Sequence, residues 1–161
     1  MKYSRGFTLV ELMIALAVLA VVVTVAVPSF TSLLERNRLT STTNQLLGFI
    51  NGARVEAIKR NAIVRIDPVT AGAWDGGLVA WVDEDGDGNR DDAEIFQEME
   101  ALPSGFTLAV SGGVNVGFRP SGLSRASGTL TLKLCSGAGK PGRDIEILAG
   151  GRMHSAPITC S

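Results

Sequence analysis

The sequence predicts an α+β protein in which one long N-terminal helix packs against antiparallel β-sheet. Residues 7–27 are predominantly apolar and carry one charge, and a helical spacing of apolar residues continues to about residue 59. Short strand-like runs separated by glycine-rich turns fill the remainder. The chain has 161 residues and a formal net charge of −1, which fits one domain with an appendage.

The apolar segment Phe7–Val27 contains 21 residues. As a helix it spans about 31 Å, roughly the hydrocarbon thickness of a bilayer. Lys2 and Arg5 precede it, so the N-terminus is expected in the cytoplasm and the rest of the chain outside. A cleaved secretory signal fits poorly, because the apolar run is too long and the small residue Gly6 precedes it. An ordinary anchor leaves Glu11 unexplained, since a carboxylate inside a bilayer costs about 2.5–3.5 kcal/mol.

A basic leader, Gly6, Phe7 and then Thr8-Leu9-Val10-Glu11-Leu12 resemble the class III signal of type IV pilins and type II secretion pseudopilins. The resemblance implies that a prepilin peptidase cuts between Gly6 and Phe7 and that the new Phe7 amine is methylated. It also implies that Glu11 pairs with the Phe7 amine of a neighbouring subunit during assembly. An unpaired carboxylate would be costly in a low-dielectric bundle, whereas one that faces an amine is compensated.

Beyond the apolar segment, the helical pattern continues. Apolar residues recur every three or four positions at Leu33, Leu34, Leu39, Leu46, Leu47, Ile50, Ala53, Ala57 and Ile58. We therefore expect one helix from about Phe7 to about Lys59. Pro28 stands where helices of the resembled family commonly kink, and a kink is expected there.

After Arg60 the sequence changes to strand-like runs. The expected strands are Ala62–Ile66, Leu78–Val82, Ile95–Met99, Phe106–Val110, Val114–Phe118, Thr129–Cys135, Asp144–Leu148 and Arg152–His154. The run at Thr129–Cys135 alternates apolar and polar residues, as a strand with one buried face does.

A second resemblance, to the GspH/FimT group of minor pilins and pseudopilins, rests on four stretches. These are Val116-Gly-Phe-Arg-Pro-Ser-Gly, a strand ending at Leu134-Cys135, Arg143-Asp-Ile-Glu-Ile, and Gly150-Gly-Arg152. The resemblance implies a pilin fold with a cleaved leader (residues 1–6) and a transmembrane or filament-core helix (7–28). An amphipathic helix of the head (29–60) and a β-rich globular domain (61–161) would follow.

The two cysteines are Cys135 and Cys160. An even count in an exported domain favours a disulfide, with a free pair as the alternative. A bond would add about 3.5 kcal/mol to the free energy of unfolding in the chain-entropy estimate, because it closes a loop in the unfolded chain. The pair resembles that of FimU-type pilus minor pilins more than that of secretion subunits.

Residues 83–94 satisfy the calcium-loop pattern D-x-[DN]-x-[DN]-G-x₅-E. The ligand positions are Asp83, Asp85, Asp87, Asn89 (through its carbonyl), Asp91 and Glu94. Calcium is therefore the cofactor candidate. Two features argue against an EF-hand: the flanks look like strands, and Arg90 stands where such loops place an apolar residue. A solvated β-hairpin turn is the alternative interpretation.

Charge is unevenly distributed along the chain. Residues 83–100 hold nine acids against one base, and residues 101–161 hold six bases against two acids. Some FimT-type relatives bind DNA through a basic G-R-x-R motif, but here His154 replaces the second arginine. Candidate DNA contacts are Lys140, Arg143 and Arg152, although six cations spread over a solvated sheet is the favoured interpretation.

No nucleophile–base spacing or phosphate-binding glycine motif is present, so an enzyme is not expected. The sequence predicts a FimU-like minor type IV pilin of the priming or tip complex, which supports pilus assembly and twitching motility. Alternatives are a GspH-like minor pseudopilin of a type II secretion system and a FimT-like DNA-binding pilin for natural transformation. Expected partners are minor and major pilins or pseudopilins, the prepilin peptidase, the inner-membrane assembly platform and the membrane. The chain would cross the bacterial inner membrane once, with its head in the periplasm, before incorporation into a filament.

Overall fold

The computed structural model describes residues 6–113 and 116–161. The expected leader at residues 1–5 and positions 114–115 of one expected strand lie outside the described residues. The chain divides into two units, residues 1–37 and 38–161.

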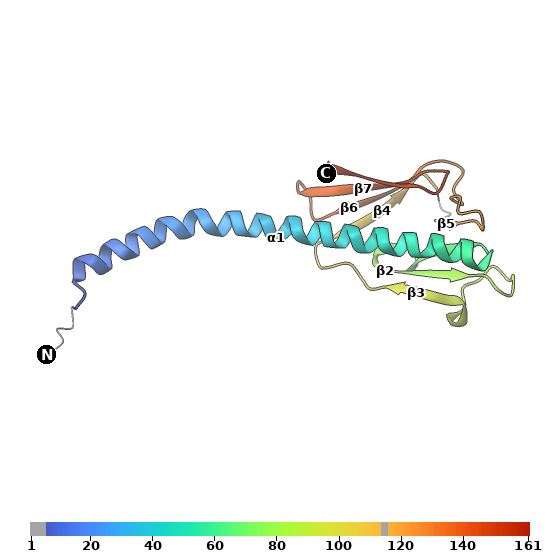
Figure 1. Ribbon diagram of the computed structural model, residues 1–161, viewed down its shortest axis with the longest axis horizontal. Coiled ribbons are helices and arrows are strands. Elements are labelled where there is room, and N and C mark those ends of the chain that lie inside the picture. The colour runs from blue at the N-terminus through green and yellow to red at the C-terminus, as the bar shows by residue number, and fades with distance from the viewer. Residues whose placement is uncertain (1–5, 114–115) are drawn as a thin grey trace. The chain divides into compact units, whose positions relative to one another are not determined.

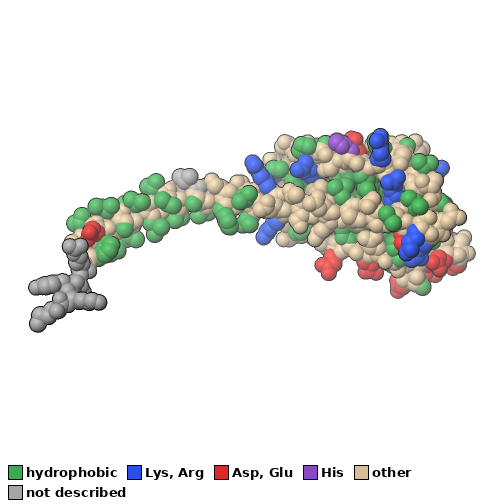
Figure 2. Space-filling view, viewed as in Figure 1, with side chains coloured by type: hydrophobic (Ala, Val, Ile, Leu, Met, Phe, Trp, Pro, Cys, Tyr) green, Lys and Arg blue, Asp and Glu red, His purple; other side chains and the backbone are tan. Residues whose placement is uncertain are grey.

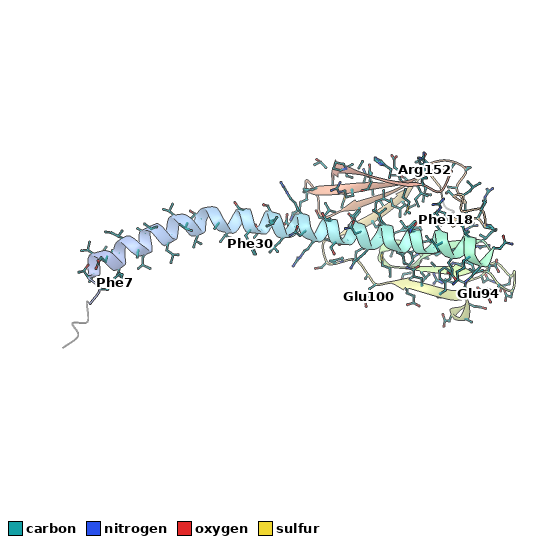
Figure 3. All side chains as sticks on the ribbon, viewed as in Figure 1. Phe7, Phe30, Glu94, Glu100, Phe118 and Arg152 are labelled. Carbon is teal, nitrogen blue, oxygen red and sulfur yellow. A yellow bond between two sulfur atoms is a disulfide. The ribbon has the colours of Figure 1, made fainter. Side chains whose placement is uncertain are left out.

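One helix, α1 (Leu9–Arg60), contributes to both units. Its bounds agree closely with the predicted helix Phe7–Lys59. Between residues 9 and 37, the described side chains of α1 are exposed, as the sticks along the helix from Phe7 to Phe30 illustrate (Figure 3). The helix continues through position 28; the kink near Pro28 stays a prediction.

The second unit contains two antiparallel sheets of four strands each (Figure 1). The first sheet has the order β3-β2-β1-β5 and the second has the order β4-β6-β7-β8. The strands of the first are β1 (Val64–Thr70), β2 (Ala73–Val82), β3 (Ile95–Met99) and β5 (Gly117–Phe118). Those of the second are β4 (Thr107–Ser111), β6 (Leu130–Cys135), β7 (Pro141–Ile147) and β8 (Met153–Thr159). Each expected strand overlaps one of these, and a single 3-10 turn, Asp92–Glu94, precedes β3.

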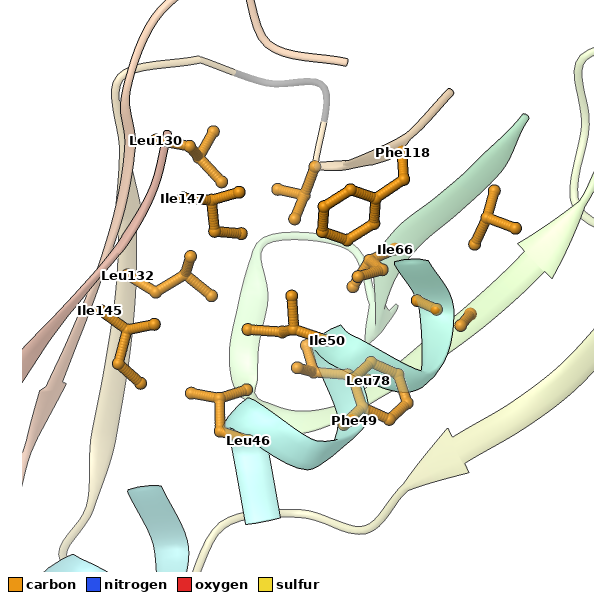
Figure 4. Close-up of a cluster of buried hydrophobic side chains, with 14 of the residues drawn as sticks. Leu46, Phe49, Ile50, Ile66, Leu78, Phe118, Leu130, Leu132, Ile145 and Ile147 are labelled. Atoms are coloured by element: carbon orange, nitrogen blue, oxygen red, sulfur yellow. The ribbon is translucent and has the colours of Figure 1, made fainter. Parts of the chain in front are cut away.

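The C-terminal half of α1 lies between the two sheets (Figures 1 and 4). Leu46, Ile50, Ala53 and Ala57 are fully buried and recur every three or four residues, so they form one stripe of the helix. The sheets contribute buried side chains to the same cluster, among them Ile66, Leu78, Phe118, Leu130, Leu132, Ile145 and Ile147. The predicted alternation of β6 is confirmed, because its three leucines are buried while Thr131 and Lys133 are more exposed.

Two turns that are distant in sequence meet on α1. The turn Arg119–Gly122 lies against the loop that contains Gly151, and the side-chain N–H of Arg54 donates to the Gly122 carbonyl at 2.9 Å. Gly151 has a φ of 74° and is buried. A Cβ at this position would overlap the carbonyl oxygen of Gly122, so the close approach requires glycine.

We expect Gly151→Ala to lower the free energy of unfolding by about 2–4 kcal/mol, because it adds left-handed backbone strain to a steric overlap. The neighbouring Gly150→Ala is the matched control, since a Cβ there has no atom within 4 Å. Denaturant unfolding of the full chain in detergent measures both variants. Equal stability of the two would contradict the close-packed junction.

A disulfide joins Cys135, the last residue of β6, to Cys160 after β8. The prediction of a bonded rather than a free pair is confirmed. Two backbone hydrogen bonds also hold Cys160 in place. The N–H of Cys160 donates to the Lys140 carbonyl and the N–H of Gly139 donates to the Cys160 carbonyl, both at 2.9 Å. The C-terminal strand is therefore fixed to the end of β6.

Replacing both cysteines, as Cys135→Ser with Cys160→Ser, should cost about 3.5 kcal/mol of unfolding free energy, because the bond closes a loop with a sequence separation of 25. Denaturant titrations with and without dithiothreitol measure this cost. Reduction should destabilise the natural chain and leave the double variant unchanged. A wild-type chain insensitive to complete reduction would contradict the assignment.

Candidate functional site

A capping arrangement forms the start of α1. The backbone N–H and the hydroxyl of Thr8 each donate to Glu11 Oε2 at 2.9 Å. In return, the backbone N–H of Glu11 donates to the Thr8 hydroxyl oxygen at 3.2 Å. This is the reciprocal pattern of a capping box, which satisfies N–H groups that the first helical turn leaves without partners. The sequence interpretation gave Glu11 no partner in its own chain, and the structure supplies Thr8.

The predicted cleavage position lies just before this cap. Gly6 and Phe7 are exposed and precede the first helical residue, Leu9. Phe7 is 80% exposed, and within the described residues no atom other than those of its chain neighbours lies within 4 Å of a Cβ built on Gly6. The peptide bond between them is thus in exposed, non-helical backbone.

The N-terminal part of α1 is long and apolar enough to cross a membrane, by length and composition. Its large apolar side chains are exposed, and Figure 2 shows hydrophobic side chains along this stretch. Those with more than half of their surface exposed include Leu9, Val10, Met13, Ile14, Leu16 and Val21. A continuous exposed apolar surface of this kind is typical of a segment that contacts a membrane or another protein.

The acidic loop between β2 and β3 brings three of the six expected calcium ligands together. One carboxylate oxygen each from Asp83, Asp85 and Asp87 lies within 4.8 Å of the others. The side-chain amide and the backbone N–H of Asn89 donate to Asp87 and lower the pKa of that carboxyl group. Clustered acids of this kind repel one another unless a cation lies between them.

The other two expected acidic ligands lie outside that group. Glu94 is buried, and its two carboxylate oxygens accept the backbone N–H groups of Glu84 at 2.7 Å and Asp91 at 3.3 Å. Desolvation and the neighbouring carboxylates, Asp87 first among them, raise the pKa of Asp91. The loop therefore differs from an EF-hand, in which the last glutamate is a bidentate ligand.

Two arginines tie the loop to the outward face of the first sheet. The Arg65 guanidinium donates to Asp83 at 3.2 Å and to the Gly88 carbonyl at 3.3 Å, and it lies 4.8 Å from the centre of the Trp81 ring. Arg90 donates to the carbonyls of residues 68 and 69. Trp81 is only 2% exposed, although it lies outside the main core cluster. The loop is thus tied to the sheet by these two arginines, while its residues 84–93 are exposed.

Sequence reasoning missed these tethers. It noted Arg90 only as a departure from the calcium-loop pattern and did not consider Arg65. Alternation along β1 could have found Arg65, because Val64 and Ile66 are buried in the core and the residue between them faces outward.

The three candidate DNA contacts are not brought together. β7 and β8 form an antiparallel pair in which Pro141 is opposite Thr159 and Ile147 is opposite Met153. Lys140 and Arg152 consequently stand at opposite ends of this hairpin, about 20 Å apart at the usual rise per residue. Arg143 lies within β7 and is partly buried.

Two family models match the chain. The prokaryotic N-terminal methylation motif matches residues 1–27, and the type II transport protein GspH model matches residues 42–151. The pilin-like protein PilA1 of Thermus thermophilus is 32% identical over 159 residues, which cover 93% of this chain and 97% of that protein.

Solved structures share the fold. The type IV minor pilin FimU of Pseudomonas aeruginosa PAO1, in a P21 crystal form, superposes with a TM-score of 0.63 at 22% identity. This match covers 79% of the present chain and 98% of FimU. A second crystal form of FimU gives a TM-score of 0.61 at 20% identity, over 76% and 100% of the two chains.

These matches confirm the predicted α+β pilin fold, with one long helix packed on antiparallel sheet. They also explain the exposed apolar helix, because pilins assemble with other pilins or pseudopilins. The chain belongs to the GspH family of minor type IV pilins and pseudopilins, a family with a structural pilin fold.

Proposed function

We propose that this chain is a minor type IV pilin, a structural subunit of the priming or tip complex that supports pilus assembly and twitching motility. One observation carries the proposal: the first turn of an exposed apolar helix holds a carboxylate, Glu11, whose hydrogen-bond donors in its own chain come from the uncharged Thr8. The proposed action is assembly, rather than catalysis.

The proposed pathway starts with the chain in the inner membrane, crossing it once, with the head in the periplasm and Lys2 and Arg5 on the cytoplasmic side. Prepilin peptidase cuts between Gly6 and Phe7, and the Phe7 amine is methylated. At the assembly platform, Glu11 exchanges its contact with Thr8 for the Phe7 amine of a neighbouring subunit. The bonds from Thr8 already have a charged acceptor, so the exchange is favoured by the full positive charge of the amine, which compensates the carboxylate in a low-dielectric helix bundle.

A minor pseudopilin of a type II secretion system is the second candidate, because the same helix and cap would serve either machine. A DNA-binding pilin for transformation has less support, since Lys140 and Arg152 lie at opposite ends of one hairpin. A deletion strain scored for twitching, protein secretion and transformation separates the three. Loss of twitching alone supports the pilus assignment, and loss of secretion alone contradicts it.

Complementing that strain with Glu11 variants tests the mechanism. Glu11→Gln can keep the capping hydrogen bonds but removes the charge, whereas Glu11→Ala removes both. We expect both variants to be inserted and cleaved normally, yet to be at least about tenfold depleted from sheared filaments on immunoblots. The expectation follows from the ion pair, which neither variant can form.

The control is Glu35→Gln, an acid farther along the same helix, which should be incorporated normally. If Glu11→Gln is incorporated like the natural chain while Glu11→Ala is not, the role of Glu11 is to cap its own helix. That outcome contradicts pairing with a neighbour.

We further propose that Asp83, Asp85 and Asp87 bind calcium, with an affinity in the millimolar range of extracellular sites. Calcium at about 5 mM should raise the Tm of the full chain in detergent, because the cation relieves repulsion among the carboxylates. Asp87→Asn should reduce this rise, and Asp92→Asn, outside the ligand pattern, should not. An unchanged Tm with calcium removes the proposal.

A further inference from the structure

A small hairpin extends the first sheet beyond β5 and carries two arginines. The N–H of Arg119 donates to the Leu123 carbonyl at 2.9 Å, and the N–H of Arg125 donates to the Gly117 carbonyl at 3.0 Å. Gly117 is in turn the β-partner of Arg65 on β1. Arg65 therefore lies on a strand of the first sheet, and Arg119 and Arg125 lie in the loop that is hydrogen-bonded beside it.

Packing places two of them side by side on one face. Gly117 has no side chain, and the Arg125 stem occupies the space above it, with Cδ 3.2 Å from where a Cβ of residue 117 would stand. Arg65 lies next to this position and stacks on Trp81 on its other side. Trp81, Arg65 and Arg125 thus form a row across the outward face of the sheet, with Arg119 two residues along from Gly117.

This row has a surplus of positive charge, and we call Arg65, Arg119 and Arg125 the arginine patch. Burial, and after it the positive charges of Arg65 and Arg119, lower the pKa of Arg125, while the nearby Asp67 carboxylate opposes this shift. Asp83 pairs with Arg65. Among residues 6–113 and 116–161, no carboxylate forms an ion pair with Arg119 or Arg125. Asp67, the nearby acid, accepts the Trp81 indole N–H at 2.6 Å.

The negative charge complementary to the arginine patch lies on the same face of the same sheet. The acidic loop is tied to the sheet by Arg65 and Arg90, and its acids at residues 84–92 are exposed. Figure 2 shows acidic side chains gathered on the side of the head where β3 and this loop lie. The loop and the patch are thus neighbours on one surface, where Arg65 of the patch also contacts the loop of its own chain.

We propose that the arginine patch of one head binds the acidic loop of a second copy of this chain. Because both surfaces lie on one face, a two-fold axis brings each loop onto the patch of the other copy, as in an isologous dimer. The planar guanidinium group matches carboxylate geometry, which suits arginine to this contact. The proposal rests on the proposed function as an assembling subunit, since confinement of both copies to one membrane raises their effective concentration.

Sedimentation of the full chain in detergent at several salt concentrations measures the association. We expect a salt-sensitive dimer whose dissociation constant rises at least about tenfold between roughly 50 and 500 mM NaCl, because exposed charges are screened. Arg119→Glu with Arg125→Glu (the patch variant) should abolish it, as should Asp85→Lys with Asp87→Lys (the loop variant). Lys133→Glu with Lys140→Glu has the same net charge as the patch variant but lies outside the patch, and it should dimerise like the natural chain.

Mixing supplies the decisive result. Neither the patch variant nor the loop variant should self-associate, but an equimolar mixture of the two should form heterodimers. In the heterodimer, the unaltered patch of one variant meets the unaltered loop of the other. The two altered surfaces meet as well, with their charges exchanged in sign. This rescue also shows that each variant is folded. Failure of the mixture to associate, or dimers of the patch variant alone, overturns the proposal.

Duplex DNA is the remaining probe. Salt-dependent retention of DNA by the natural chain and not by the patch variant, without any self-association, would overturn the proposal in favour of a nucleic-acid surface. Failure of the self-association experiments can be told apart from failure of the proposed function. Incorporation into filaments is tested separately, with Glu11 variants that leave the patch intact.

Discussion

Burial of one helical stripe between two sheets is the constraint on which the head depends. Leu46, Ile50 and Ala53 belong to one buried cluster with side chains from both sheets, so neither sheet can be removed without exposing the helix. The same requirement explains the glycines at the junction of the turns. For the second sheet to close over the helix, the Gly151 loop must approach the Gly122 carbonyl more closely than any side chain allows. The disulfide then fixes the last strand of that sheet. The buried stripe of the helix, the glycine contact and the disulfide thus all help to hold the two sheets against one helix.

Electrostatics shapes the outer face of the first sheet. Nine acids within residues 83–100 would repel one another in an extended loop. Arg65 and Arg90 hold the loop against the sheet, and buried Glu94 accepts two backbone N–H groups inside it. The strongly acidic segment is therefore ordered by partners of opposite charge and by its own backbone. Its exposed acids remain available to a cation or to another subunit.

Sequence reasoning predicted the features that depend on local pattern. The helix bounds, the strand at Ile95–Met99 and the pairing of the two cysteines follow from periodicity, turn residues and an even cysteine count. The division into two sheets was not predicted, because it depends on which strands pair across long separations in the chain. The Arg65–Trp81 stack and the Gly122–Gly151 contact were missed for the same reason. Each joins residues that have no shared local pattern, and only the register of the folded sheets brings them together.

The Thr8 cap has a consequence for the reversibility of assembly. Both donors of Thr8 bond to Glu11 Oε2, so in the proposed assembly the neighbour's amine meets a carboxylate that is already partly satisfied. The gain on assembly is then the difference between two satisfied states, which is smaller than the strength of an ion pair formed from an unsatisfied acid. A subunit that leaves the filament recovers its own cap. Helix capping of this kind would therefore make the proposed exchange between membrane and filament easier to reverse.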